Sequence, residues 1–298
     1  MLHWHIERKL MSNLTLMTER EAATGTELAN ELRTKYACLK EILRAIGRAV
    51  VAYSGGVDST LVAKVALDTL GSENVLAVLA VSPSLGKEEF RQALNLLSEI
   101  GIPYLTVETA EVDDPAYAAN PINRCYFCKQ HVYSALLEVA RPRGFETIVD
   151  GFNADDRGDY RPGRKAGREL GVRSPLAEAE LGKDAIRALA RYLKLNNWSK
   201  SSMACLSSRV EYGTIITPQI LDRIDRAELA LRKLGFDDLR VRHHDKLARI
   251  EVDEDAIERA LACRDQIINA VKAAGYVYVT LDLQGLRHGS MNEGLKHG

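Results

Sequence analysis

Residues 54–60 form a short glycine-containing string whose residue types suit the binding of an anion. The members of this phosphate loop are Ser54, Gly55, Gly56, Val57, Asp58, Ser59 and Thr60. Two adjacent glycines let the backbone turn tightly, so that successive amide N–H groups and the start of a helix can face one phosphate or pyrophosphate. The hydroxyls add donors, and Asp58 could hold Mg²⁺ on a nucleotide. The alternative is an ordinary turn with Asp58 or Ser59 capping a helix, but the complete string directly after a strand favours anion binding.

Three of the five cysteines are candidates for one sulfur-rich centre. Cys125 and Cys128 are three residues apart at the expected start of a helix, where both can face the same side and the positive helix end favours thiolates. Cys205 has small and hydroxyl-bearing neighbours and precedes Arg209, which suits a reactive thiolate or a ligand. From the residues alone, the first two cysteines could be a redox couple, part of a zinc or iron–sulfur site, or simple packing.

Three thiolates would hold three irons of a cubane 4Fe–4S cluster and leave the fourth iron open to an external sulfide. Tetrahedral zinc is the competing interpretation, although only His131 lies near any of the three cysteines in sequence. The remaining cysteines, Cys38 and Cys263, lie in helical apolar stretches, so we expect them to serve in packing.

The elements that must position these residues follow a regular alternation. Apolar runs of strand length are expected at 50–53, 75–81, 104–107 and 147–151, and segments of helical spacing at 27–47, 59–70, 87–100 and 125–139. Because parallel strands need such crossovers, the pattern predicts a doubly wound α/β fold with a parallel sheet. The phosphate loop then follows the first strand. A polar stretch over 150–170, too irregular for a helix or strand, follows the fourth.

After residue 217 the pattern changes to helix, strand, strand, helix and strand, at 218–234, 239–243, 248–252, 254–274 and 276–283. This order predicts a smaller α+β domain. We therefore expect an N-terminal leader over 1–26, a first domain over 27–204 and a C-terminal α+β domain over 205–298.

Composition narrows the class of partner. Lys and Arg number 40 and Asp and Glu number 41, so the net charge of −1 provides no overall basic field to hold nucleic acid or an anionic membrane. The longest apolar runs are too short to span a bilayer, and the leader has no apolar signal region. An odd number of cysteines argues for reduced thiols. We expect a cytoplasmic protein with a small-molecule partner.

The phosphate loop resembles the PP-loop of the ATP pyrophosphatase superfamily, whose fold is adenine nucleotide alpha hydrolase-like. It lacks the Gly-Lys-Ser/Thr ending of a Walker loop. The resemblance implies cleavage of ATP between the α and β phosphates and adenylylation of a substrate oxygen. It also implies that adenine lies against the second strand, near Val78–Val81.

Four segments together resemble the LarE family of ATP-dependent sulfur-insertion enzymes. They are the phosphate loop and residues 120–129, 150–163 and 204–213, within a match over 27–292. The resemblance implies conversion of pyridinium-3,5-biscarboxylic acid mononucleotide to its thiocarboxylic form through an acyl adenylate, on the route to the nickel-pincer cofactor of lactate racemase. Members with one cysteine, at the position of Cys205, give up its sulfur, whereas members with three carry a labile sulfide on a cluster. All three positions are cysteine here, so we predict the cluster form.

The resemblance also implies roles for single residues. ATP and Mg²⁺ would bind at the phosphate loop, and Cys205, Glu228 and Asp58 would be catalytic. A 4Fe–4S cluster would be held by Cys125, Cys128 and Cys205. Planar guanidinium groups for the substrate carboxylates and phosphate would come from Arg161, Arg164, Arg209, Arg240 and Arg242. From charge pattern alone, the arginine-rich loop could equally be a solvated face and Glu228 a surface ion pair. A homo-oligomer is implied as well.

Two other functions stay open on the sequence. A tRNA thiolase shares the loop and the cysteines, but near-zero net charge and no recognisable RNA-binding segment weigh against it. A nucleotide-binding protein with structural zinc on its three cysteines is the non-catalytic alternative. The sequence identifies neither the sulfur donor nor the oligomer size, and it does not tell whether Cys205 is consumed.

Overall fold

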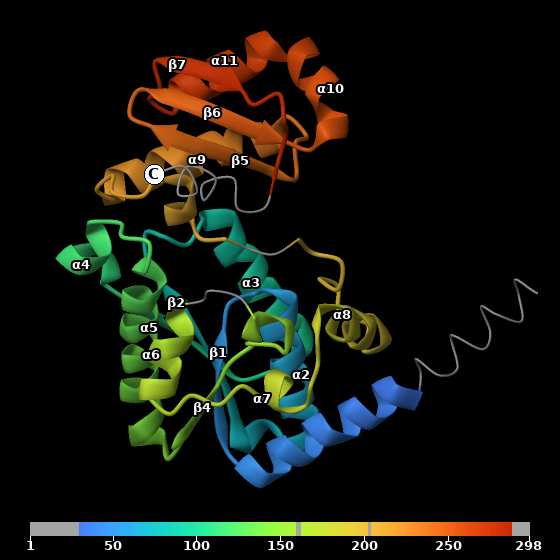
Figure 1. Cartoon of the computed structure of the whole chain (residues 1–298). Helices are drawn as coiled ribbons and strands as arrows, with labels where there is room; N and C mark the ends of the chain where they lie inside the picture. Colours follow the sequence, from blue (N-terminus) through green and yellow to red (C-terminus); the bar gives the residue numbers. More distant parts are fainter. Residues whose placement is uncertain (1–29, 159–161, 202–203, 288–298) are drawn as a thin grey trace, which may run out of the picture.

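A computed structural model describes residues 30–158, 162–201 and 204–287. The larger of its two sheets has four strands in the order β3-β2-β1-β4, all of them parallel (Figure 1). These strands are β1 (Ala49–Tyr53), β2 (Val75–Val81), β3 (Tyr104–Glu108) and β4 (Thr147–Val149). The predicted doubly wound parallel sheet is therefore confirmed.

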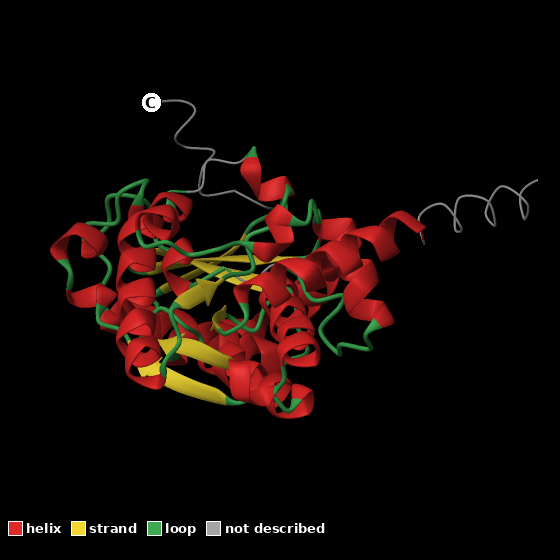
Figure 2. Ribbon diagram, turned by 90° about the horizontal axis from the view of Figure 1, so that it is seen from below, coloured by secondary structure: helices red, strands yellow, loops and turns green. Residues whose placement is uncertain are grey.

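Side chains along the central strands alternate between two apolar layers. On β1, Val51 packs with α2 (Val57–Leu70), α3 (Lys87–Ile100) and α8 (Lys183–Tyr192), whereas Val50 packs with α5 (Arg124–Ala140) on the opposite face. Helices therefore cover both faces of the sheet (Figure 2). The helix over residues 30–46 belongs to the first layer, where it buries Leu39 and Leu43 completely.

The polar stretch after β4 contains more regular structure than its composition predicts. A 3-10 turn, η4 (Asp155–Arg157), is followed by the short helix α6 (Gly163–Glu169), so the expectation of a segment without helix is wrong. α6 lies close along α5, because a Cβ on Gly167 would already be 3.3 Å from the Tyr133 ring. Glycine permits this close helix contact, which is a tertiary effect that local composition does not report.

The second sheet belongs to the C-terminal part of the chain. Its unit comprises α9 (Pro218–Lys233), β5 (Leu239–His244), β6 (Leu247–Val252), α10 (Ile257–Ala262), α11 (Arg264–Ala273) and β7 (Tyr278–Leu281). β5 and β6 form an antiparallel hairpin, and β7 joins β6 in parallel. The predicted order is confirmed, but the helix expected over 254–274 is divided at Cys263 after the turn η6 (Glu254–Ala256). The division lets Ala260 of α10 and Val271 of α11 share one core.

Short elements complete the described chain: η1 (Ser72–Asn74), η2 (Glu111–Asp113), α4 (Pro115–Ala118), η3 (Arg141–Arg143), α7 (Pro175–Glu178) and η5 (Leu206–Arg209). The carboxyl ends of the parallel strands face the C-terminal unit (Figure 1). The proposed domain boundary after residue 204 lies between α8 and α9 and stays a prediction, and the leader over 1–26 lies outside the described residues. No helix in the described ranges is long and apolar enough to cross a membrane.

Candidate functional site

The phosphate loop joins the carboxyl end of β1 to α2, which begins inside the loop at Val57. Gly55 has a φ of +77°, a conformation that favours glycine. The carbonyl oxygen of Gly56 accepts hydrogen bonds from the Thr60 amide (3.0 Å), from Thr60 Oγ1 (2.8 Å) and from Ser59 Oγ (3.1 Å). Because this carbonyl is turned into the helix, the loop can present amide N–H groups and the α2 N-terminus to an anion.

The hydroxyls of the loop divide into two kinds. Thr60 is fully buried, and its Oγ1 lies 3.2 Å from the hydroxyl of Tyr53 and donates to Gly56 O. Ser54 is exposed, and its Oγ lies 3.0 Å from Ser59 Oγ. Thr60 therefore supports the loop from its buried side, whereas Ser54 lies on the exposed side, which a phosphate could approach.

Asp58 is oriented by a residue from the loop that follows β4. Nδ2 of Asn153 donates to Asp58 Oδ2 at 2.8 Å, and Asn153 is itself fully buried. Asn153 and Asp156 hold each other, since each side chain accepts a hydrogen bond from the other's backbone amide. A Cβ on Gly151 would lie 2.7 Å from the Ser59 amide nitrogen, so this loop packs directly against the phosphate loop. The carboxylate expected to hold Mg²⁺ is thus fixed by a second loop at the same sheet edge.

Electrostatic interactions link the three candidate thiols, because Cys125 and Cys205 both act on Cys128 and on Arg124. Burial raises the pKa of Cys128 to about 12, and the nearby thiols of Cys205 and Cys125 act in the same direction. Burial alone would lower the pKa of Arg124, but negative charge at Cys205 and Cys125 raises it overall. Arg124 is 5% exposed and donates to Ser207 O at 3.0 Å, which links the start of α5 to the Cys205 segment.

Within the described residues, no three His, Cys, Asp or Glu side chains converge tightly enough to hold a metal ion. A cubane cluster attaches each thiolate to a different iron, so its ligands need not converge on one point. The donor set of three thiols beside one buried guanidinium fits such a cluster in its chemistry.

A buried ion pair holds the backbone at Cys205. Arg209 donates to Ala204 O (2.5 Å) and Cys205 O (3.1 Å), and its other nitrogens contact both Glu228 oxygens at 2.9 and 3.0 Å. Glu228 also accepts from the Val241 amide at 3.0 Å. Burial acts to raise the pKa of Glu228, but the Arg209 charge and these hydrogen bonds hold it below its ordinary value. Glu228 is therefore no surface ion pair, and both residues act on Cys205 through its backbone.

The other candidate arginines differ in their contacts with the rest of the protein. Arg242 is buried and donates to Glu251 (2.7 Å) and to Ser208 O (3.0 Å). Arg240 is half-buried, and its pKa is lowered to about 10 by burial and by the positive charges of Arg209, Arg242 and Arg232. A bound anion would offset this excess of positive charge.

The remaining two arginines come from the loop after β4. Arg164 stacks over the Phe152 ring at 4.8 Å, and its pKa is lowered by burial and by the charges of Arg168 and Arg157. Arg161 lies outside the described residues.

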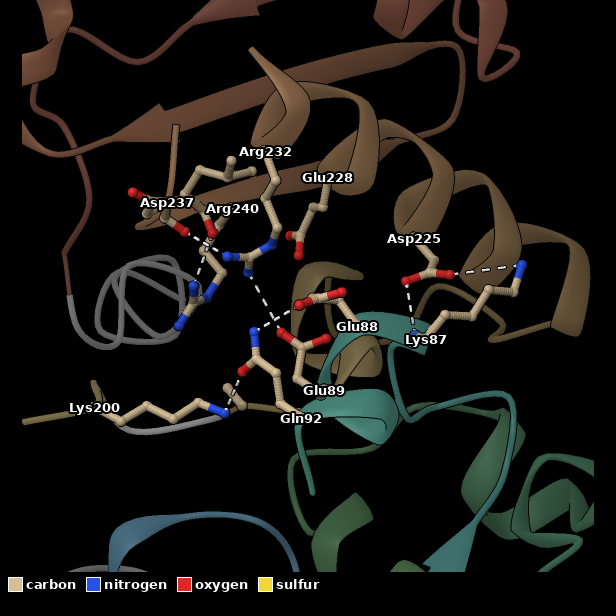
Figure 3. A network of polar contacts seen from close by, with 12 residues as sticks. Lys87, Glu88, Glu89, Gln92, Lys200, Asp225, Glu228, Arg232, Asp237 and Arg240 are labelled. Atoms are coloured by element: carbon tan, nitrogen blue, oxygen red, sulfur yellow. Dashed lines mark hydrogen bonds and ion pairs between the residues drawn. The ribbon is translucent and has the colours of Figure 1, made fainter. Parts of the chain in front are cut away.

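Polar contacts tie the C-terminal unit to the first residues of α3 (Figure 3). Asp225 of α9 accepts a hydrogen bond from the Lys87 amide at 3.2 Å, and Arg232 contacts Glu89 at 3.4 Å. Lys200, on the connection between the two units, donates to Gln92 at 2.8 Å. These contacts hold the C-terminal unit, which carries Arg240, against the first turns of α3.

The segment carrying Cys205 is also bonded to the loop after β2. The Leu206 amide donates to Ser84 O at 2.9 Å. The hydroxyls of Ser82 (2.5 Å) and Ser84 (2.9 Å) donate to the buried carboxylate of Glu111. The thiol-bearing segment and the strand expected to meet adenine are therefore joined.

Sequence reasoning does not single out Asn153, Glu111 or Asn197, although all three hold parts of the site. Asn153 at least lies in the polar loop that the sequence marks as functional. Asn197 follows an amphipathic helix without any motif, and Nδ2 of its side chain donates to Gly55 O and Thr60 Oγ1. No local signal could have revealed it.

A doubly wound sheet whose first strand passes through this loop into a helix N-terminus defines a nucleotide-binding enzyme of the PP-loop class. The NAD synthase family profile matches residues 31–122, which hold β1, the phosphate loop, β2 and β3. An NH₃-dependent NAD⁺ synthetase of Chlorobaculum tepidum is 35% identical over 75 residues, which are 25% of this chain and 27% of that protein.

Two other similarities extend over nearly the whole chain. The pyridinium-3,5-bisthiocarboxylic acid mononucleotide synthase of Lactiplantibacillus plantarum is 42% identical over 264 residues, 89% of this chain and 96% of that enzyme. An uncharacterized protein of Synechocystis is 44% identical over 263 residues, 88% of this chain and 98% of that protein. The chain therefore belongs to the pyridinium-3,5-bisthiocarboxylic acid mononucleotide synthase family, LarE.

Proposed function

We propose that this protein inserts sulfur into pyridinium-3,5-biscarboxylic acid mononucleotide at the expense of ATP, in the biosynthesis of the nickel-pincer nucleotide. A substrate carboxylate attacks the α phosphorus of ATP, and pyrophosphate leaves. A sulfur nucleophile then attacks the carbonyl carbon of the acyl adenylate, and AMP leaves. Adenylylation is needed because a carboxylate oxygen is a poor leaving group, whereas AMP is a good one.

The nucleotide half of the reaction falls to the phosphate loop. Its backbone amides and the N-terminus of α2 would take the pyrophosphate portion of ATP. Asp58, fixed by Asn153 at 2.8 Å, would hold Mg²⁺, which offsets charge on the departing pyrophosphate. The loop after β2, from which Ser84 contacts the Cys205 segment, would meet the adenosine portion.

For the substrate we propose Arg240 as the main anion-binding residue, together with Arg164 and with Arg161, which lies outside the described residues. Arg209 and Arg242 are engaged with Glu228 and Glu251, so their contribution is to hold the backbone around Cys205 and Ser208. Of the five arginines that the family resemblance implies for substrate binding, we therefore propose three for that role.

The sulfur half of the reaction falls to Cys125, Cys128 and Cys205, which we propose as ligands of a 4Fe–4S cluster. When bound, such a cluster would supply a labile sulfide at the iron that no cysteine holds. Arg124, beside Cys125 and Cys205, would offset the negative charge of the thiolates. The observation that carries this proposal is that Cys125 and Cys205 both act on the buried guanidinium of Arg124 and on the thiol of Cys128.

Turnover tests the proposed reaction directly. Anaerobic protein with ATP, Mg²⁺, sulfide and the biscarboxylic nucleotide should release AMP and pyrophosphate and form a product in which sulfur replaces oxygen, measured by mass spectrometry. ATP cleavage without a need for this nucleotide, or cleavage that depends on tRNA instead, would contradict it.

Iron content tests the ligand set. Anaerobic protein should contain about four irons per chain, the nuclearity of a cubane cluster. Replacing any one of Cys125, Cys128 or Cys205 by alanine should remove most of this iron, because each thiolate holds its own iron. Cys38→Ala and Cys263→Ala are the matched controls and should retain it. A colourless protein that contains zinc would contradict the cluster.

We place the reaction in the cytoplasm, where the thiols stay reduced. Assembly into a homo-oligomer is part of the proposal, and gel filtration with light scattering tests it.

A further inference from the structure

Asn197 contacts the phosphate loop from outside the motif. Its Nδ2 donates to Gly55 O at 3.3 Å and to Thr60 Oγ1 at 3.0 Å, and the residue is only 6% exposed. We propose that Asn197 is a positioning residue for ATP, because it fixes the Gly55–Gly56 peptide with the Gly56 N–H facing the bound phosphate.

The geometry of a trans peptide supports this assignment. The carbonyl oxygen of Gly55 and the amide hydrogen of Gly56 point in opposite directions, because the peptide unit is planar and trans. Holding the oxygen on the Asn197 side therefore directs the N–H to the other side. There the Gly56 amide donates a long hydrogen bond of 3.4 Å to Oγ of Ser54, the exposed hydroxyl of the loop, so the N–H is directed to the side that a phosphate would approach.

The orientation of the Asn197 amide is set by the loop. With the amide reversed, Oδ1 would face the carbonyl oxygen of Gly55, two acceptors without a proton between them. In the observed orientation Nδ2 serves two loop oxygens, and buried Oδ1 has no donor within the described residues. Asn197 thus leaves its own Oδ1 without a donor while Nδ2 supplies hydrogen bonds to the phosphate loop. This arrangement is expected of a side chain that supports a binding site.

The inference rests on the ATP use that the proposed function requires, but not on the identity of the substrate. Binding of ATP, inorganic pyrophosphate and AMP to the full chain, each measured by calorimetry without the pyridinium nucleotide, therefore tests it separately. Asn197→Ala should weaken the binding of ATP and pyrophosphate about tenfold, the usual cost of a buried carbonyl left without a donor. AMP, which lacks the β and γ phosphates, should bind with nearly unchanged affinity.

Asn196→Ala is the matched control, since the neighbouring side-chain amide donates to Glu99 at 2.7 Å on an exposed surface. It should bind all three ligands as the unmodified protein does. Asn197→Asp provides a second variant of equal size, and it should weaken ATP binding at least as much as alanine because its oxygens oppose Gly55 O.

Unchanged ATP affinity in either folded Asn197 variant would overturn the proposal. An equal loss for AMP and ATP would also overturn it, because the loss would then reflect general packing. If neither variant shows a folding transition in a thermal melt, the proposal is also overturned, because Asn197 would then serve the stability of the whole fold. A different outcome would contradict only the proposed reaction. In that case Asn197→Ala weakens the binding of ATP and pyrophosphate but not of AMP, and the unmodified protein nevertheless inserts no sulfur.

Discussion

Arg209 holds the backbone around Cys205 through hydrogen bonds to carbonyl oxygens. One of its nitrogens donates to the carbonyl oxygens of Ala204 and Cys205, and the others contact both oxygens of Glu228. Arg209 is 2% exposed, so removal of its partner would leave a buried charge uncompensated. The family resemblance implies a catalytic Glu228 and a substrate-binding Arg209, and these roles stay predictions. The hydrogen bonds of the pair show in addition that it holds the backbone of Cys205.

Glu228→Gln should lower stability at neutral pH by about 3 kcal/mol, since breaking a buried ion pair costs several kcal/mol. The folded-state pKa of Glu228 lies below its ordinary value of 4.5. The unfolded chain therefore binds the proton more readily, and the stability from this pair is present above about pH 4.5 and lost as the pH falls through the lower folded pKa. Melting of both proteins from pH 7 down to about pH 3 should show a difference that stays constant above about pH 4.5 and narrows below it.

Glu178→Gln is the control, because Glu178 forms a similar pair with Arg173 at the surface. Exposed pairs contribute about 0–1 kcal/mol, so this variant should melt close to the unmodified protein. Equal losses in the two variants, or a difference for Glu228→Gln that does not depend on pH, would contradict the assignment.

At the scale of elements, the apolar periods predict most of the fold and say little about the contacts between loops. The alternation of strand and helix spacing is a local property, and all four parallel strands lie where it predicts them. The helix α6 escaped prediction because glycines that permit its contact with α5 read locally as loop formers. Similarly, only the folded sheet places Gly151 against the phosphate loop.

Gly151→Ala should weaken ATP binding more than tenfold. The added Cβ would lie 2.7 Å from the Ser59 amide nitrogen, and backbone shifts of this kind cost about 1–3 kcal/mol. Gly158→Ala in the same loop is the control, because a Cβ there meets nothing within 4 Å and its backbone is helical. Titration with ATP, alongside circular dichroism for folding, measures both. Equal ATP affinities would show that the close approach of the loops is unimportant.

At the scale of the whole molecule, the C-terminal unit contacts the first turns of α3. Asp225 supplies from α9 the acceptor that the α3 N-terminus lacks, because the local cap residue Gly86 has no side chain. Nearby, Arg232 and Lys200 contact Glu89 and Gln92 on the first turns of α3 (Figure 3). The unit that carries Arg240 is thereby attached next to the loop that follows β2.

Asp225→Ala should lower the melting temperature by a few degrees, because loss of a helix cap together with a buried acceptor costs about 1–2 kcal/mol. Asp222→Ala is the control. Asp222 also contacts Lys87, at 3.0 Å, but both side chains are well exposed, so little change is expected. Differential scanning fluorimetry compares the two, and an equal shift would contradict the capping role of Asp225.

The sequence by itself determined the parallel sheet, the position of the phosphate loop and the identities of the three candidate thiols, because periodicity and motif spacing are encoded locally. It could not determine which side chains serve those residues from a distance. Asn153, Asn197 and Glu111 were not identified, and the arginines held in buried ion pairs, Arg209 and Arg242, were not distinguished from the others. Those roles depend on hydrogen bonds between segments that lie far apart in the chain. Only tertiary packing, which buries these groups and forces each to find a partner, decided them.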